Sequence, residues 1–188
     1  ETALAGSRIL SFLNEDLIPQ DIRNMTREAS AKDDVLDDIL KMSRELVTIR
    51  DNNELFQSII SRVNRITGAE RGAIFLLEKN SSPPAFLLRA SKNLTSEQVD
   101  EQNFAASWKI IRDVAETRKG TVLETDPSDH HDPGKGEILS RICVPLILRN
   151  EIIGVLYNDN RFMKSAFSAV NLNILEHFAS QAAIALDN

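Results

Sequence analysis

Apolar residues recur at helical spacing towards both ends of the chain, whereas the middle carries short apolar runs that are typical of strands. Helices are therefore expected over 33–50, 55–67, 107–120 and 169–188. Strands are expected over 72–78, 86–91, 121–124, 141–148 and 152–157. The segments 92–106 and 125–137 are polar, and we expect them to be irregular or looped.

Two pairs of strands are joined by segments with turn chemistry, at 80–84 and at 149–151. This arrangement predicts two hairpins and hence an antiparallel sheet. Helices that come before, between and after the strands must cover the faces of that sheet. The sequence therefore predicts an α+β fold, with a central antiparallel sheet of about five or six strands flanked by helices and an N-terminal helical extension.

The pattern divides the chain into three parts. Residues 1–31 are expected to be a helical linker or the remnant of a preceding segment, 32–52 a signalling helix, and 53–188 the folded domain. The helix carries apolar residues at intervals of 4, 3, 4 and 3, the spacing that lets two helices supercoil. This predicted dimer seam consists of Val35, Ile39, Met42, Leu46 and Ile49. The alternative is an ordinary amphipathic helix packed on its own domain.

Local signals also define the start and end of the helix at 55–67. Asp51 and Glu54 have the spacing of a capping box, with Asp in place of the usual Ser or Thr. Gly68 follows the last apolar turn, as expected of a residue in the C′ position.

Composition narrows the range of functions. The net charge of −6 argues against a nucleic-acid-binding surface, which needs clustered Lys and Arg. No apolar run approaches the ~18–20 residues that cross a bilayer, and no secretory signal opens the chain. The single cysteine, Cys143, excludes an intramolecular disulfide and a Cys-based zinc cage. A cytoplasmic setting is expected, and the chain is interpreted as a piece of a longer protein.

Three motifs in order resemble the GAF domain family. The segment 141–161 is similar to the last GAF hairpin, 66–77 to the first helix-to-strand junction, and 167–188 to the closing helix. The resemblance covers roughly 53–188 and is closest to GAF domains of bacterial signalling proteins such as sigma-54-dependent transcriptional regulators. It implies a sheet flanked by helices with a small-molecule cleft, and it leaves the ligand or cofactor unknown, since fold does not settle function.

Cyclic-nucleotide-binding GAF domains share an Asn-Lys…Phe-x-x-x-Asp-Glu signature. The corresponding positions here are Asn160, Arg161, Phe167, Asn171 and Leu172. Both acidic residues are replaced, which argues against a cyclic nucleotide. The remaining residues are also explained by a helix start, with Ser168 as N-cap, Phe167 and Leu172 as a hydrophobic staple, and Asn171 at N3.

Other candidate chemistry is weak. Cys143 lies among apolar residues on an expected inner strand, so we interpret it as a buried structural thiol. The segments 130–132 (His-His-Asp) and 134–136 (Gly-Lys-Gly) are interpreted as a solvated loop and not as a metal site or a phosphate loop. His177 is expected to be a partly buried structural residue and not a haem ligand.

The favoured function is a non-catalytic sensor that forms a homodimer through terminal helices, binds a small molecule and passes a signal to a covalently linked output domain. Pocket candidates, chosen by topology alone, are Phe75, Leu77, Phe86, Trp108, Ile111 and Tyr157. Two alternatives are a ligand-free dimerisation scaffold and the regulatory domain of an adenylate cyclase, serine phosphatase or histidine kinase. A third is a GAF-like free-methionine-sulfoxide reductase, which would need more cysteines than Cys143.

Overall fold

The computed structural model describes residues 51–125 and 136–187, together with four single positions, 37, 41, 44 and 49. The chain divides into two compact units, 1–42 and 43–188, and the fold described here is that of the second. The predicted seam residues 35, 39, 42 and 46 lie outside the described residues, as do 1–31. Ile49 is half-buried and lies outside a helix.

A five-stranded antiparallel sheet forms the centre of the domain, in the order β2-β1-β5-β4-β3. Its strands are β1 (Arg71–Glu78), β2 (Ala85–Lys92), β3 (Thr121–Glu124), β4 (Ser140–Leu148) and β5 (Glu151–Asn160). The predicted sheet and both hairpins are confirmed. Arg149 and Asn150 both have positive φ, as a two-residue turn of the type that matches strand twist requires.

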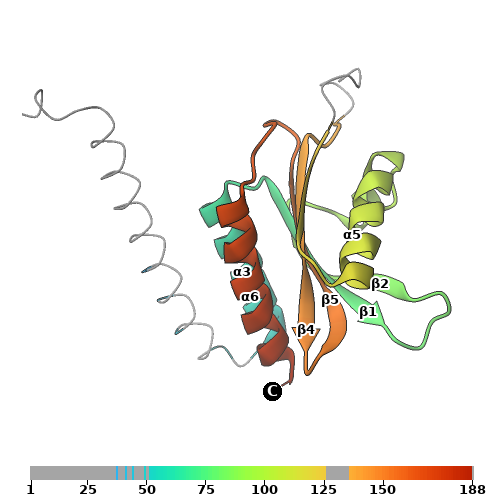
Figure 1. The fold of residues 1–188 in the computed structure, drawn as a ribbon, viewed down its shortest axis with the longest axis vertical. Coiled ribbons are helices and arrows are strands. Elements are labelled where there is room, and N and C mark those ends of the chain that lie inside the picture. Colours follow the sequence, from blue (N-terminus) through green and yellow to red (C-terminus); the bar gives the residue numbers. More distant parts are fainter. Residues whose placement is uncertain are drawn as a thin grey trace, which may run out of the picture. The chain divides into compact units, whose positions relative to one another are not determined.

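Helices cover both faces of the sheet (Figure 1). On one face α3 (Asn52–Thr67) and α6 (Ala169–Asp187) lie side by side against the strands. On the other face lies α5 (Ala105–Thr117), preceded by the short α4 (Ser96–Val99) and the 3-10 turn η2 (Gln102–Phe104). The segment predicted to be irregular, 92–106, therefore contains two short helical turns.

The predicted helix caps are largely present. Asp51 Oδ1 accepts hydrogen bonds from the backbone N–H groups of Asn53 (2.7 Å) and Glu54 (3.1 Å), and Gly68 ends α3 with φ 70°. At α6, Asn171 N–H donates to Ser168 Oγ (3.4 Å), and Ser168 N–H donates to Asn171 Oδ1 (2.8 Å). This reciprocal pair confirms that Ser168 and Asn171 begin a helix, as the sequence predicts.

The end of α5 differs from the prediction. The left-handed residue that closes it is Arg118, with φ 60°, and not Gly120. Gly120 instead lies where α6 approaches closely, because a Cβ there would come within 2.9 Å of the side chains of Leu172 and Glu176. The glycine thus serves packing between elements and not the end of a helix.

Alternation along the strands creates a separate apolar layer on each face of the sheet. On the α5 side, the core cluster includes Phe75, Cys143, Val155 and Tyr157. On the opposite side, the buried residues of α3 and α6 include Phe56, Ile59, Leu175 and Phe178. Burying each large apolar side chain contributes roughly 1.5–3 kcal/mol before entropy is counted.

Candidate functional site

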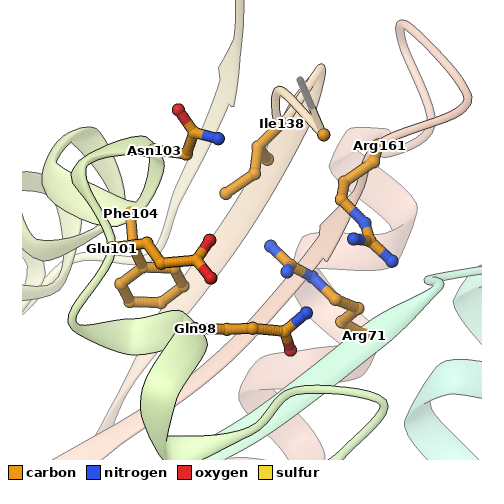
Figure 2. Close-up of a pocket in the computed structure, with 8 residues that line it drawn as sticks. Arg71, Gln98, Glu101, Asn103, Phe104, Ile138 and Arg161 are labelled. Atoms are coloured by element: carbon orange, nitrogen blue, oxygen red, sulfur yellow. The ribbon is translucent and has the colours of Figure 1, made fainter. Parts of the chain in front are cut away.

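A polar cavity of about 260 Å³ lies where β1 begins and β5 ends, beside α4 and η2 (Figure 2). Its walls come from segments that are distant in sequence and carry mostly polar side chains. The lining residues are Arg71, Gln98, Glu101, Asn103, Phe104, Gly136, Ile138 and Arg161. None of the six sequence-predicted pocket residues is among them.

The two long walls of the cavity carry opposite charges. Figure 2 shows the guanidinium groups of Arg71 and Arg161 on one side, and Gln98, Glu101 and Asn103 on the other. Phe104 and Ile138 add apolar surface. The cavity can therefore offer hydrogen-bond donors, a carboxylate and a small apolar patch to one molecule.

Arg71 is held by a buried ion pair. Its Nε and Nη2 donate to the two carboxylate oxygens of Asp159, at 2.7 and 2.6 Å, and the side chains are 4% and 0% exposed. The pair follows directly from the sheet, since Arg71 and Asp159 are opposite each other in the β1–β5 register. Such a two-pronged geometry fixes the guanidinium plane as well as the charge.

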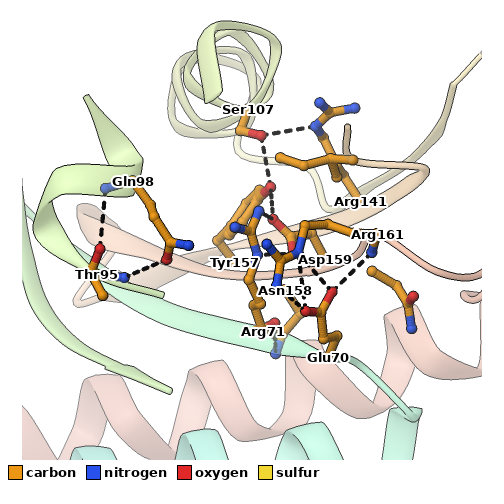
Figure 3. Close-up of polar contacts among 12 residues, drawn as sticks. Glu70, Arg71, Thr95, Gln98, Ser107, Arg141, Tyr157, Asn158, Asp159 and Arg161 are labelled. Carbon is orange, nitrogen blue, oxygen red and sulfur yellow. Dashed lines mark hydrogen bonds and ion pairs between the residues drawn. The ribbon is translucent and has the colours of Figure 1, made fainter. Parts of the chain in front are cut away.

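Three further side chains extend this ion pair across the domain (Figure 3). Tyr157 Oη donates to Asp159 Oδ2 at 2.7 Å and also lies 2.7 Å from Ser107 Oγ on α5. Arg141 Nε donates to the same Ser107 oxygen at 2.8 Å. Burial, together with the charge of Asp159, raises the pKa of Tyr157 well above its ordinary value, so the phenol stays a proton donor. The network connects α5 to the cavity wall.

Arg161 is held in a similar way by Glu70. The Arg161 side chain and its backbone N–H both donate to the Glu70 carboxylate, with an Nε–Oε1 distance of 3.0 Å. Burial by itself raises the pKa of Glu70, but the Arg161 hydrogen bonds and charge outweigh it and lower that pKa below its ordinary value. Both arginines of the cavity are therefore positioned by carboxylates behind them.

The opposite wall is fixed by local hydrogen bonds. Thr95 and Gln98 form a complete capping box around the start of α4. Trp108 Nε1 donates to the Val99 carbonyl oxygen at 2.8 Å and so attaches α4 to α5. Phe104 N–H donates to the Glu101 carbonyl oxygen at 3.0 Å, which sets the direction of η2.

Five of the six sequence-predicted pocket residues lie in or against the core cluster beneath this wall. Phe75, Trp108 and Tyr157 belong to one aromatic cluster with Phe104, and the ring centroids of Phe75 and Trp108 are 5.1 Å apart. Ile111 is buried in the same cluster, Phe86 packs against it half-buried, and Leu77 is half-buried opposite Phe86 in the sheet. Their role as ligand contacts stays a prediction.

The structure also places the other residues that the sequence singled out. Cys143 is fully buried, as predicted, and burial raises the pKa of its thiol far above the ordinary value. His177 is exposed on α6, so the prediction of partial burial is wrong; it lies on the outer side of the helix, next to the buried Phe178. The segments 130–132 and 134–135 lie outside the described residues. Among residues that the structure describes, no group of three His, Cys, Asp or Glu could hold a metal.

None of the helices within 51–125 and 136–187 is long and apolar enough to cross a membrane.

Fold and cavity together define an α+β domain in which a five-stranded antiparallel sheet lies between two helical layers. A family model for the GAF domain matches residues 50–187. The chain belongs to the GAF domain family. No curated protein matches the sequence.

Solved structures confirm the fold. The GAF domain of an Acinetobacter phosphoenolpyruvate-protein phosphotransferase superposes with a TM-score of 0.64 at 20% identity, covering 81% of this chain and 92% of that one. The GAF domain of a putative sensor histidine kinase from Pseudomonas syringae pv. tomato gives 0.64 at 16%, covering 87% and 92%. Free methionine-R-sulfoxide reductase from Neisseria meningitidis gives 0.61 at 14%, covering 79% and 86%. These identities support similarity of fold alone.

Proposed function

We propose that this GAF domain is a non-catalytic sensory module of a larger cytoplasmic signalling or transcription-regulatory protein. In this proposal it binds a small molecule in the polar cavity and forms a homodimer through its terminal helices, which connect it to a covalently linked output domain. Similar GAF folds occur in a sensor histidine kinase and a methyl-accepting chemotaxis protein. A sigma-54-dependent regulator remains the host that the sequence resemblance favours.

The observation that carries the dimer is the outer face of α6. Exposed residues recur along it at intervals of 3, 4, 3 and 4 and so share one face of the helix, here called the α6 seam, with apolar residues at both ends and polar residues between them. These residues are Val170, Asn173, His177, Ser180 and Ile184. Val170 and Ile184, near the two ends, are 53% and 54% exposed. Two copies of α6 packed along this seam would cover both apolar side chains.

The absence of catalysis is supported by the state of the only thiol. Cys143 is 0% exposed and its pKa is raised, so the nucleophilic thiolate is disfavoured. A reductase reaction of the kind named for the Neisseria relative would need an accessible thiol. The two arginines of the cavity, Arg71 and Arg161, instead form ion pairs with neighbouring carboxylates. Groups held in this way suit the binding of a ligand.

The dimer is tested by sedimentation equilibrium of the full chain at tens of micromolar. Ile184→Glu should weaken dimerisation by at least about tenfold, since each copy would place a charge on the seam. Leu87→Glu is the matched control, because Leu87 is equally exposed, at 54%, but lies on β2. Ile39→Asp and Met42→Asp examine the predicted seam at 35–49 in the same assay. A monomeric wild-type chain would refute the dimer.

A ligand-free scaffold is the second candidate, favoured by the filling of the sheet-to-α5 layer with aromatic side chains. The two candidates differ in their response to small molecules, because any ligand of the native state raises its stability by mass action. A thermal-shift screen of nucleotides, amino acids and oxo-acids separates them. A dimer that no compound stabilises would favour the scaffold.

A further inference from the structure

We infer that the polar cavity takes a small zwitterion, a molecule of amino-acid size that carries an ammonium group and a carboxylate. The inference rests on the proposed function, in which this cavity binds a ligand, and it names the class of that ligand. It is drawn from the charges of the residues that line the cavity and from the volume of the cavity.

The charges of the cavity face each other. Glu101, the N-cap residue of η2, extends its carboxylate towards the wall that holds Arg71 and Arg161 (Figure 2). Among the described residues no salt bridge joins Glu101 to either arginine, although Glu101 is close enough for its charge to contribute to the raised pKa of Arg161. A ligand between the walls would therefore meet a carboxylate on one side and guanidinium groups on the other.

The arginines are arranged to recognise a carboxylate. Each guanidinium has five N–H donors in a rigid fork. Arg71 uses its Nε and Nη2 to bond to Asp159, and Arg161 uses the same two atoms to bond to Glu70. The Nη1 atom of each arginine takes part in neither of these pairs of bonds. Nη1 of Arg161 lies 4.0 Å from the position that a Cβ on Gly136 would occupy, and Gly136 lines the cavity. The carboxylates behind the arginines thus fix the planes of two donor groups.

A ligand of one sign fits the cavity poorly. A free anion would be attracted to arginines whose charge is already balanced by Asp159 and Glu70, and it would also meet Glu101. A free cation would be attracted to Glu101, but on the opposite wall it would meet guanidinium groups, which offer only hydrogen-bond donors. Selectivity of this type depends on repulsion of the wrong ligand as well as attraction of the right one. A zwitterion satisfies both walls.

Size and surface narrow the class further. A volume of about 260 Å³ lies below the ~300–1,000 Å³ of pockets for drug-sized ligands. Phe104 and Ile138 provide the apolar part of the lining. The cavity therefore suits a molecule of amino-acid size, to which Phe104 and Ile138 offer a small apolar contact.

The test compares L-leucine with two derivatives that each lack one charge, N-acetyl-L-leucine and L-leucinamide. Thermal shift and isothermal titration calorimetry are run on the full chain with these three probes and with each standard L-amino acid. We expect at least one free amino acid of the leucine, valine or methionine type to bind. We expect its N-acetylated and amidated forms to bind at least about tenfold more weakly.

Glu101→Gln removes the proposed ammonium partner and keeps the shape of the side chain. It should weaken binding of the free amino acid by at least about tenfold while leaving the unliganded melting temperature unchanged, because Glu101 is exposed. Glu97→Gln is the matched control: Glu97 is exposed on α4 and does not line the cavity. Unchanged affinity in Glu101→Gln would overturn the inference.

Other outcomes separate this inference from the proposed function. Equal binding of leucine and N-acetyl-leucine would show an anion site and overturn the zwitterion. Stabilisation by a nucleotide or oxo-acid, with no response to any amino acid, would overturn the ligand class and leave the sensor proposal standing. No response to any compound would refute both the zwitterion and ligand binding, whereas the dimer is judged by sedimentation alone.

Discussion

Replacing Asp159 with asparagine removes one charge from the centre of the domain with almost no change in shape. Asp159 is 0% exposed and accepts three short hydrogen bonds, two from Arg71 and one from Tyr157. An asparagine can accept at only one of the two positions, and its NH₂ group would face a donor at the other. Arg71, at 4% exposure, would then be a buried cation without its counter-charge.

The magnitude follows from that unpaired charge. Removing one partner of a buried ion pair costs about 3–5 kcal/mol, against a total stability of about 5–15 kcal/mol for a domain. For a protein of this size about 2–4 °C of melting temperature is lost per kcal/mol. Asp159→Asn should therefore lower the melting temperature by roughly 6–20 °C.

Thermal unfolding followed by circular dichroism measures the melting temperature and urea unfolding the free energy, with Asp187→Asn as the control. Asp187 also pairs with an arginine at 2.6 Å, but that partner, Arg149, is 78% exposed. The control should lose no more than about 1 kcal/mol. Replacing both buried partners, as Arg71→Met with Asp159→Leu, should recover much of the loss, because no charge is left unpaired. Equal effects of Asp159→Asn and Asp187→Asn would refute the reasoning.

Two further predictions concern pH and backbone packing. The pKa of Glu70 is lowered in the folded state, so its stabilisation is complete above the ordinary value of 4.5 and is lost as pH falls through the lowered pKa. The melting temperature of Glu70→Gln should thus lie below that of the wild type at pH 7 and approach it as the pH falls below 4.5; Glu78→Gln, on an exposed residue, is the control substitution. Gly154→Ala would place a Cβ 2.2 Å from the Phe75 carbonyl oxygen, so we expect a loss of about 3 kcal/mol, the upper end of the usual cost of overpacking. Gly68→Ala meets no atom within 4 Å and should cost only about 1–2 kcal/mol for its left-handed backbone; equal losses in urea unfolding would contradict the packing argument.

The layers of the fold could be predicted because apolar periodicity reports directly which face of an element is buried. The hairpins were signalled by turn residues, and the start of α6 by Ser168 and Asn171, whose reciprocal hydrogen bonds are local. The end of β5 was harder to predict. Asn158, Asp159 and Asn160 are polar yet buried, and each side chain bonds to a distant partner on or next to α3 or β1. The bonding of Asn158 is incomplete, because its buried Oδ1 has no hydrogen-bond partner.

The cavity could not be predicted from periodicity because charged residues carry no burial signal of their own. Two of its pairs, Arg71 with Asp159 and Glu70 with Arg161, join positions about ninety residues apart. The antiparallel register of β1 and β5 determines the first pair. A search for opposite charges in that register would have found it. Topology pointed instead to large apolar side chains, which fill the core below the cavity.

Buried ion pairs add little to stability compared with well-packed apolar residues of the same volume. The pair of Arg71 and Asp159 therefore needs an explanation beyond folding, and the cavity supplies one. Arg71 belongs to both the network and the cavity wall. Asp159 holds the Arg71 plane, and Tyr157 and Ser107 hold Asp159 against α5. In a domain that binds an amino acid through Arg71, these residues act as positioning residues, and the apolar double replacement should keep the fold while losing the ligand.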